Sequence, residues 1–192
     1  MNKLLVTLLL TLSTVAAADT GNTVGISYAL RDTIASDKDN PNRQGINLSF
    51  AHKFNSNWAV DINEQFRTER LNSDDGKSST RLEGGVTYTL PVTQDITFYT
   101  RAGLGYKFAS SYDAAYYAIE PGIKFQVTQP LNVRVAYRYR NTFNDNIKDK
   151  TDTVRIGAEY NLTKEHVITA GIDRFYGDSE AIGYNIGYAY KF

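Results

Sequence analysis

The sequence contains no cysteine and has a formal net charge of zero. The lack of cysteine excludes a disulfide framework and a thiolate metal site, and it suits a protein that crosses an oxidising compartment. A neutral chain gives no electrostatic reason to expect a nucleic-acid partner. The two histidines, His52 and His166, do not stand in the H-x-S arrangement that a barrel hydrolase needs. We therefore expect no enzyme activity, no metal and no cofactor.

Long apolar runs are scarce as well. One occurs at 4–12, after Lys3 and before the small residues Ala16-Ala17-Ala18. It is shorter than the roughly 20 residues of a membrane-spanning helix, and its flanks are those of a secretory signal peptide. We expect residues 1–18 to be a signal peptide and residues 19–192 to form one domain. A buried N-terminal helix is the alternative.

The abundant feature of the sequence is alternation of apolar and polar residues. This period of two indicates strands with one apolar and one polar face. Ten segments show it: 21–33, 43–54, 57–69, 80–90, 95–108, 113–127, 130–143, 152–162, 166–176 and 181–192. Their lengths suit a tilted strand that crosses a membrane, which takes about 9–11 residues. The prediction is an all-β fold, a transmembrane antiparallel up-and-down β-barrel of ten strands, with eight or twelve strands as alternatives.

The connections support a bacterial outer-membrane location. Tight turns around Ser56, Thr93, Gln129 and Lys164 alternate with mostly longer loops, as in outer-membrane barrels. The C-terminal stretch "YNIGYAYKF", ending in Phe192, is similar to the assembly signal of bacterial outer-membrane proteins. We expect a monomer whose partners are the barrel-assembly machinery and outer-membrane lipid or lipopolysaccharide. A secreted β-sandwich is the alternative, because its strands alternate too.

Two positions interrupt the pattern. Glu64 falls on the apolar parity near mid-depth, where an ionised carboxylate facing lipid is costly. Either a bulge shifts the register there or the apolar band is short on that wall. Pro121, inside a strand segment, predicts a bulge or irregular pairing.

The inward-facing positions are mainly basic. The basic residues there are Arg31, Arg43, Lys53, Arg67, Arg81, Arg101, Lys107, Lys124, Arg134, Arg138, Arg140, Arg155 and Lys191; the acidic ones are Asp61, Glu83, Glu120, Glu159 and Asp173. Most other acidic residues, such as Asp149, fall in loops and turns. The neutral chain therefore predicts a basic interior and acidic outer loops. Inward glycines such as Gly105 and Gly122 are expected to leave space.

Hairpin geometry suggests which inward charges are paired. The expected ion pairs are Arg155 with Asp173, Arg67 and Arg101 with Glu83, and Arg138 with Glu120 or Glu159. Two like-charged contacts are also expected, Arg140 beside Arg155 and Arg134 near Lys124. Like charges side by side destabilise a sheet unless water or an anion accommodates them. Arg134 and Arg140 are therefore the first candidates for an anion site.

The segment "LNVRVAYRYRNTF", followed by "TDTVRIGAEYNLTKEHVITAGIDRF", resembles the oligogalacturonate-specific porin family. Its members are small monomeric outer-membrane channels that pass acidic oligosaccharides through arginine-lined lumens. The resemblance implies lumen roles for Arg134, Arg138, Arg140 and Arg155, and an acidic oligosaccharide as substrate. It also implies twelve strands, where the sequence shows ten segments.

These observations lead to one functional hypothesis and one alternative. The first is an outer-membrane channel with a basic, arginine-rich lumen for small anionic solutes or acidic oligosaccharides. The residues expected to line its pore and bind anions are Arg134, Arg138, Arg140, Arg155, Arg101, Arg67 and Lys124. Eight strands leave an interior that side chains just fill. The alternative is therefore a small structural or adhesive barrel with a filled interior and no transport.

Overall fold

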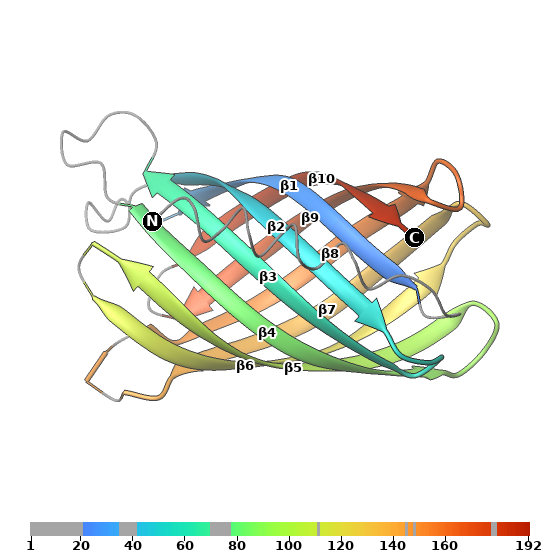
Figure 1. The fold of residues 1–192 in the computed structure, drawn as a ribbon. Coiled ribbons are helices and arrows are strands. Elements are labelled where there is room, and N and C mark those ends of the chain that lie inside the picture. The colour runs from blue at the N-terminus through green and yellow to red at the C-terminus, as the bar shows by residue number, and fades with distance from the viewer. Residues whose placement is uncertain are drawn as a thin grey trace.

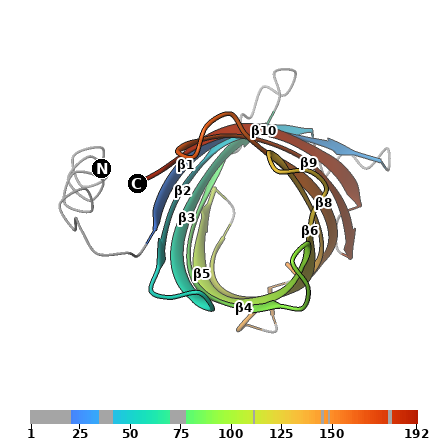
Figure 2. The ribbon, with the colours of Figure 1, turned by 90° about the vertical axis from the view of Figure 1, so that its right-hand side faces the viewer.

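The computed structural model describes residues 21–34, 42–69, 78–110, 112–144, 146–147, 149–177 and 180–192. The expected signal peptide, residues 1–18, lies outside them. Within the described residues the chain forms ten strands that close into one barrel (Figures 1 and 2). The strands are β1 (Asn22–Thr33), β2 (Arg43–Lys53), β3 (Trp58–Glu69), β4 (Ser78–Pro91), β5 (Ile96–Ala109), β6 (Asp113–Gln126), β7 (Leu131–Thr142), β8 (Thr151–Asn161), β9 (His166–Gly177) and β10 (Ala181–Lys191). None of these residues forms a helix with the length and apolar character needed to span a membrane.

Every strand pairs antiparallel with its neighbours in sequence, and β1 pairs with β10. That last ladder runs from Thr23 opposite Lys191 to Thr33 opposite Ala181. Closure follows from the environment, since lipid offers no partner for the backbone groups of an open sheet edge. The prediction of ten strands is confirmed, and the twelve implied by the family resemblance are wrong for this chain.

The two ends of the barrel differ in their connections. Four short turns, 54–57, 92–95, 127–130 and 162–165, lie at what we call the turn end, where β10 also finishes. A backbone hydrogen bond of 2.9 Å from the nitrogen of Val127 to the oxygen of Leu131 closes one of them. The other connections lie at the opposite end, called the loop end. Outer-membrane barrels place short turns in the periplasm, so the loop end is the external one.

Large apolar side chains point outward along the strands. Leu104 is 65% exposed and Ile186 62% exposed, whereas Tyr116 and Val167 are the only buried apolar side chains larger than alanine among the described residues. The buried apolar residues are mostly small, such as Ala29 and Ala118. A soluble β-sandwich would bury its large apolar residues instead. The outward face is therefore a lipid-facing surface, and the sandwich alternative is wrong.

Aromatic rings gather near both ends of this outward face. At the turn end the centroids of Trp58 and Tyr88 are 4.8 Å apart, and at the loop end those of Tyr106 and Phe108 are 4.7 Å apart. Such girdles mark the two interfaces of a membrane-spanning barrel.

The two irregular positions have different outcomes. Glu64 stands opposite Leu48 and Leu82 in ladders that run without a shift, so no bulge turns it inward. Its side chain stays on the outward face, where it is half-buried. At Pro121, which has no N–H to donate, the β6–β7 ladder lacks pairs at 120–121. It resumes at Gly122 opposite Ala136 in the same register. The pairing is irregular there, as predicted, without a bulge.

Candidate functional site in the barrel lumen

Tyrosine rings cover several inward-facing glycines. A Cβ placed on Gly122 would lie 2.5 Å from the Tyr99 ring, and one on Gly105 would meet the Tyr116 ring. Tyr116 is only 2% exposed. The expectation that these glycines leave space in the lumen is therefore wrong. Each lets a neighbouring strand's ring lie against the sheet, so the rings fill the volume that the missing side chains leave.

A chain of alternating charges crosses the middle of the lumen. Strands β3 to β9 each contribute one side chain to it. The ion pairs are Asp61–Arg101 at 2.5 Å, Arg101–Glu83, Glu83–Arg138 at 2.5 Å, Arg138–Glu120 at 3.4 Å, Glu120–Arg155 at 2.8 Å and Arg155–Asp173 at 3.1 Å. We call these seven side chains the ion-pair belt. The pair between Glu83 and Arg138 joins β4 to β7, which are not neighbours, so the belt spans the lumen as well as following its wall.

The charges within the belt offset one another almost completely. Glu83 and Glu120 are 5% and 6% exposed, and buried carboxylates stay ionised only when they are well paired. Each of the three belt arginines bonds two carboxylates. Three guanidinium groups and four carboxylates give the belt a formal charge of −1. The sequence predicts both ion pairs and pore-lining roles for these arginines, and in the structure each one is held between two carboxylates and braces the wall.

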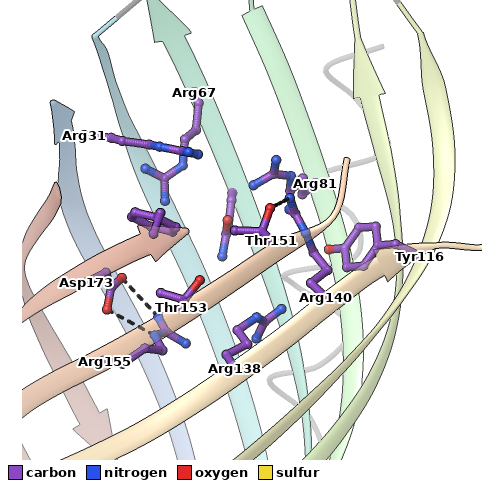
Figure 3. A pocket seen from close by; sticks show the side chains of 12 residues that line it. Arg31, Arg67, Arg81, Tyr116, Arg138, Arg140, Thr151, Thr153, Arg155 and Asp173 are labelled. Carbon is purple, nitrogen blue, oxygen red and sulfur yellow. Dashed lines mark hydrogen bonds and ion pairs between the residues drawn. The ribbon is translucent and has the colours of Figure 1, made fainter. Parts of the chain in front are cut away.

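Between the belt and the loop end lies a basic cavity of about 50 Å³ (Figure 3). We call it the outer cavity. Its lining residues are Arg31, Gln65, Arg67, Arg81, Tyr116, Arg138, Arg140, Thr151, Thr153, Arg155, Asp173 and Phe175. Six of the twelve are arginines and one is a carboxylate, so the lining is strongly cationic. The guanidinium group of Arg31 lies 4.3 Å from the centre of the Phe175 ring.

Two of these arginines have unsatisfied donors. The Nε atoms of Arg67 and Arg81 are buried and have no hydrogen-bond partner in the described part of the chain. Arg67 makes one long hydrogen bond, 3.5 Å from its Nη2 to the Oδ1 of Asn47. A buried donor without an acceptor is destabilising by about 1–3 kcal/mol, and more when the group is charged. The outer cavity therefore has more donors than acceptors.

A loop carboxylate reaches into this cationic region. Asp149, between β7 and β8, lies 2.8 Å from Nη2 of Arg140 and 3.1 Å from Nζ of Lys107. Arg140 also donates to the hydroxyl of Thr151 at 2.9 Å. Burial alone would raise the pKa of Asp149, but Arg140, Arg81 and Lys107 outweigh it and lower the pKa. The carboxylate is thus an internal counter-ion, although its place in a loop predicts an outer-loop acid.

A second basic group lies towards the turn end. Lys124 and Arg134 stand directly opposite each other on β6 and β7. Both face Glu159 of β8, at 2.7 Å and 3.7 Å. Arg134 is the most open of the predicted site residues, with 44% of its side chain exposed. Two cations thus share one carboxylate in a solvent-accessible part of the lumen.

All seven predicted site residues point into the barrel, and the expected contacts are present for all of them except Arg140 and Arg67. Arg155 does pair with Asp173, and Arg134 does face Lys124. Arg140 stands opposite Thr151 instead of beside Arg155. The inward parity was correct, whereas the register across this loop was four residues away from the one expected.

The other hairpin prediction at the loop end has the same error. Arg67 lies opposite Ser79, and Glu83 lies opposite Asn63. Glu83 bonds Arg101, as expected, and Arg138. Arg138 does bond Glu120, while Glu159 goes to Lys124 and Arg134.

Two cavity residues were missing from the predicted site. Arg31 and Arg81 were recognised as inward-facing but not as site residues. The signal that identifies them is their position: both stand near the loop end of their strands, as do Arg67 and Arg140. Inward arginines at the same depth on several strands of a closed barrel converge on one space.

The histidines lie outside this region. His52 bonds the side-chain oxygen of Asn22 at 2.8 Å, and His166 contacts the hydroxyl of Tyr188. Among the residues that the structure describes, no three His, Cys, Asp or Glu side chains are grouped to hold a metal ion.

Comparisons with known proteins agree with the fold. In solved structures, the barrel is similar to the NanC porin, with a TM-score of 0.57 and 12% identity over 88% of this chain and 100% of that one. It is also similar to an outer-membrane channel from Pseudomonas putida F1, with a TM-score of 0.54 and 10% identity over 92% of this chain and 97% of that one. For the KdgM porin the TM-score is 0.51 and the identity is 15%, over 88% of this chain and 99% of that one. At these identities the likeness is one of fold. A comparison with curated proteins gives no match.

One family model, described as the outer membrane protein beta-barrel domain, matches residues 4–161. This match covers most of the chain and agrees with the closed barrel and its outward apolar face. The chain therefore belongs to the outer membrane protein beta-barrel domain family, and its place is the bacterial outer membrane.

Proposed function

We propose that the protein is a narrow, anion-preferring channel for small anionic solutes. In this proposal the residues that contact passing anions come from the predicted set Arg134, Arg138, Arg140, Arg155, Arg101, Arg67 and Lys124. Three proteins that share the fold are called porins or channels, and one of them, the KdgM porin, has been solved with an oligogalacturonate. That likeness favours transport as the class of function.

The observation that carries the proposal is the distribution of charge along the lumen. The outer cavity lies on one side of the ion-pair belt, and the group formed by Lys124, Arg134 and Glu159 lies on the other. Both zones have more cations than carboxylates. A basic approach from each end raises the local concentration of anions and repels cations.

The ion-pair belt limits what can pass. Its charged side chains meet across the lumen, and transport past them needs a solute small enough to move between paired groups. This favours single small anions over acidic oligosaccharides. It also favours a second candidate function, a structural barrel whose filled interior conducts nothing.

Bilayer recording distinguishes these functions. The purified protein should give small, steady current steps, with a reversal potential in a salt gradient that indicates anion preference. Arg134→Glu and Arg140→Glu together should shift that potential towards cation preference. Arg174→Gln is the matched control, because Arg174 is half-buried on the outward face near the loop end and pairs with Glu180.

Each outcome has a definite meaning. No steps at all would favour the filled barrel and reject the channel. If the substitutions at Arg134 and Arg140 leave the reversal potential unchanged, the basic zones do not set the ion selectivity, and their proposed role is rejected. Block of the current by acidic oligosaccharides, at concentrations that leave it unblocked by small carboxylates, would favour the larger substrate class.

A further inference from the structure

Two like-charged pairs beside the outer cavity are the starting point. Arg81 stands directly opposite Lys107, and Arg31 directly opposite Arg43. Like charges that face each other across a ladder destabilise a sheet. One member of each pair lines the outer cavity. A counter-ion in that cavity would offset the repulsion between Arg81 and Lys107.

The donors in the cavity converge from separate strands. Arg67 comes from β3, Arg81 from β4 and Arg140 from β7, and Figure 3 shows their side chains entering the same space. Asp173, the one acid among the described residues of the lining, is already bonded to Arg155. The buried Nε atoms of Arg67 and Arg81 have no acceptor within the described residues.

The size of the cavity narrows the choice of ligand. One water molecule needs about 10–15 Å³ of such space, so a cavity of about 50 Å³ holds a few waters or one small ion. Guanidinium groups present planar forks of donors that match oxyanions with several oxygens. Guanidinium groups that approach from three strands can each bond a different oxygen of one ion. A tetrahedral oxyanion, whose oxygens point in several directions, fits this arrangement.

We infer that the outer cavity binds one small tetrahedral oxyanion, with inorganic phosphate as its simplest form, through Arg67, Arg81 and Arg140. The inference rests on the proposed function, since it names the ligand of one zone of that lumen. Asp149 already bonds Arg140 and Lys107 and thus supplies the negative charge that an entering oxyanion would bring. Its carboxylate therefore competes with the ligand.

Isothermal titration of the folded, detergent-solubilised protein with inorganic phosphate tests the site. Sodium chloride holds the ionic strength constant. We expect saturable binding of one phosphate per chain, with no comparable signal from nitrate. Arg67→Gln and Arg81→Gln should each weaken binding at least about tenfold. Asp149→Asn should tighten it several-fold, a gain that misfolding does not produce.

The control is Arg174→Gln, which removes the same charge near the same end of the barrel but on its outward face. It should leave phosphate affinity unchanged, and the emission of Trp58 should confirm that every variant is folded. The site is rejected if nitrate binds as well as phosphate. It is equally rejected if the Arg67 and Arg81 variants keep wild-type affinity, or if Asp149→Asn gives no gain.

Two further experiments are needed. One distinguishes free phosphate from lipid headgroup phosphate as the ligand, and the other distinguishes the oxyanion site from the channel function. Lipopolysaccharide added to the micelles should leave phosphate binding intact if the site takes the free ion. It should abolish that binding if headgroup phosphates occupy the site, which is still an oxyanion site. Bilayer recording is independent of both results. Phosphate binding without conductance rejects the channel and keeps the site. Anion-selective current without saturable phosphate binding in the titration rejects the site and keeps the channel.

Discussion

Replacing Glu83 by Gln removes the carboxylate that joins Arg101 to Arg138 in the ion-pair belt. Glu83 is 5% exposed, and the side chains of the two arginines are 11% and 15% exposed. Arg101 keeps Asp61 and Arg138 keeps its 3.4 Å contact with Glu120, so each loses its partner in part. Removing one member of a buried ion pair lowers the free energy of unfolding by about 3–5 kcal/mol. We expect Glu83→Gln to fall in that range.

The assay is urea unfolding from detergent or lipid vesicles, followed by the fluorescence of Trp58, the one tryptophan in the sequence. The free energy comes from linear extrapolation to zero denaturant. Adding Arg138→Met should restore part of the loss, because it removes the cation left without a full partner. Glu165→Gln, in an exposed turn, is the matched control and should change nothing measurable.

The decrease in the free energy of unfolding also shows whether water reaches the ion-pair belt. Ion pairs surrounded by water are worth about 0.2–1 kcal/mol. A loss below about 1 kcal/mol for Glu83→Gln would refute the reasoning, since it would mean that water screens the belt.

Three other predictions concern stability. Arg81→Gln should raise the free energy of unfolding by about 1 kcal/mol in phosphate-free buffer, since it removes a cation opposite another cation; a decrease in the urea midpoint would contradict this. The pKa of Asp149 is lowered, so its stabilisation is complete above the unfolded pKa of about 3.9 and is lost as the pH falls through the lower folded value. The difference in urea midpoint between the wild type and Asp149→Asn should therefore shrink below about pH 4. Gly105→Ala, whose Cβ would meet the Tyr116 ring, should destabilise by about 1–3 kcal/mol. Gly84→Ala, with no atom nearer than 3.9 Å to the new Cβ, should have little effect.

The face on which each side chain lies could be predicted from sequence because lipid and lumen impose opposite chemistry on alternate residues. In the stretch from Val133 to Arg140 the valines and tyrosines lie outward and the arginines inward, as expected. Parity is insensitive to an even shift of register, which leaves every side chain on its face. The four-residue error at Arg140 therefore left no trace in the pattern.

Contacts across the lumen could not be predicted for a further reason. The pair between Glu83 and Arg138 depends on how far the strands are staggered when the barrel closes, and periodicity along a strand does not encode that stagger. The inward path of Asp149 could not be predicted either, since it depends on the shape of a loop. The composition of the lumen and several pairs between neighbouring strands, such as Arg155 with Asp173, were predictable, whereas the contacts across the lumen were not.

The belt has a consequence for how the barrel is assembled. Its seven members come from β3 to β9, and none from β1, β2 or β10. Along the seam between β1 and β10, the inward pairs at mid-height are Gly25 with Ala189, Ser27 with Gly187 and Ala29 with Asn185. Parting this seam breaks backbone hydrogen bonds but separates no belt ion pair. The charged belt can thus form before the first and last strands meet, and this seam is one of the ladders that can part without breaking a belt ion pair.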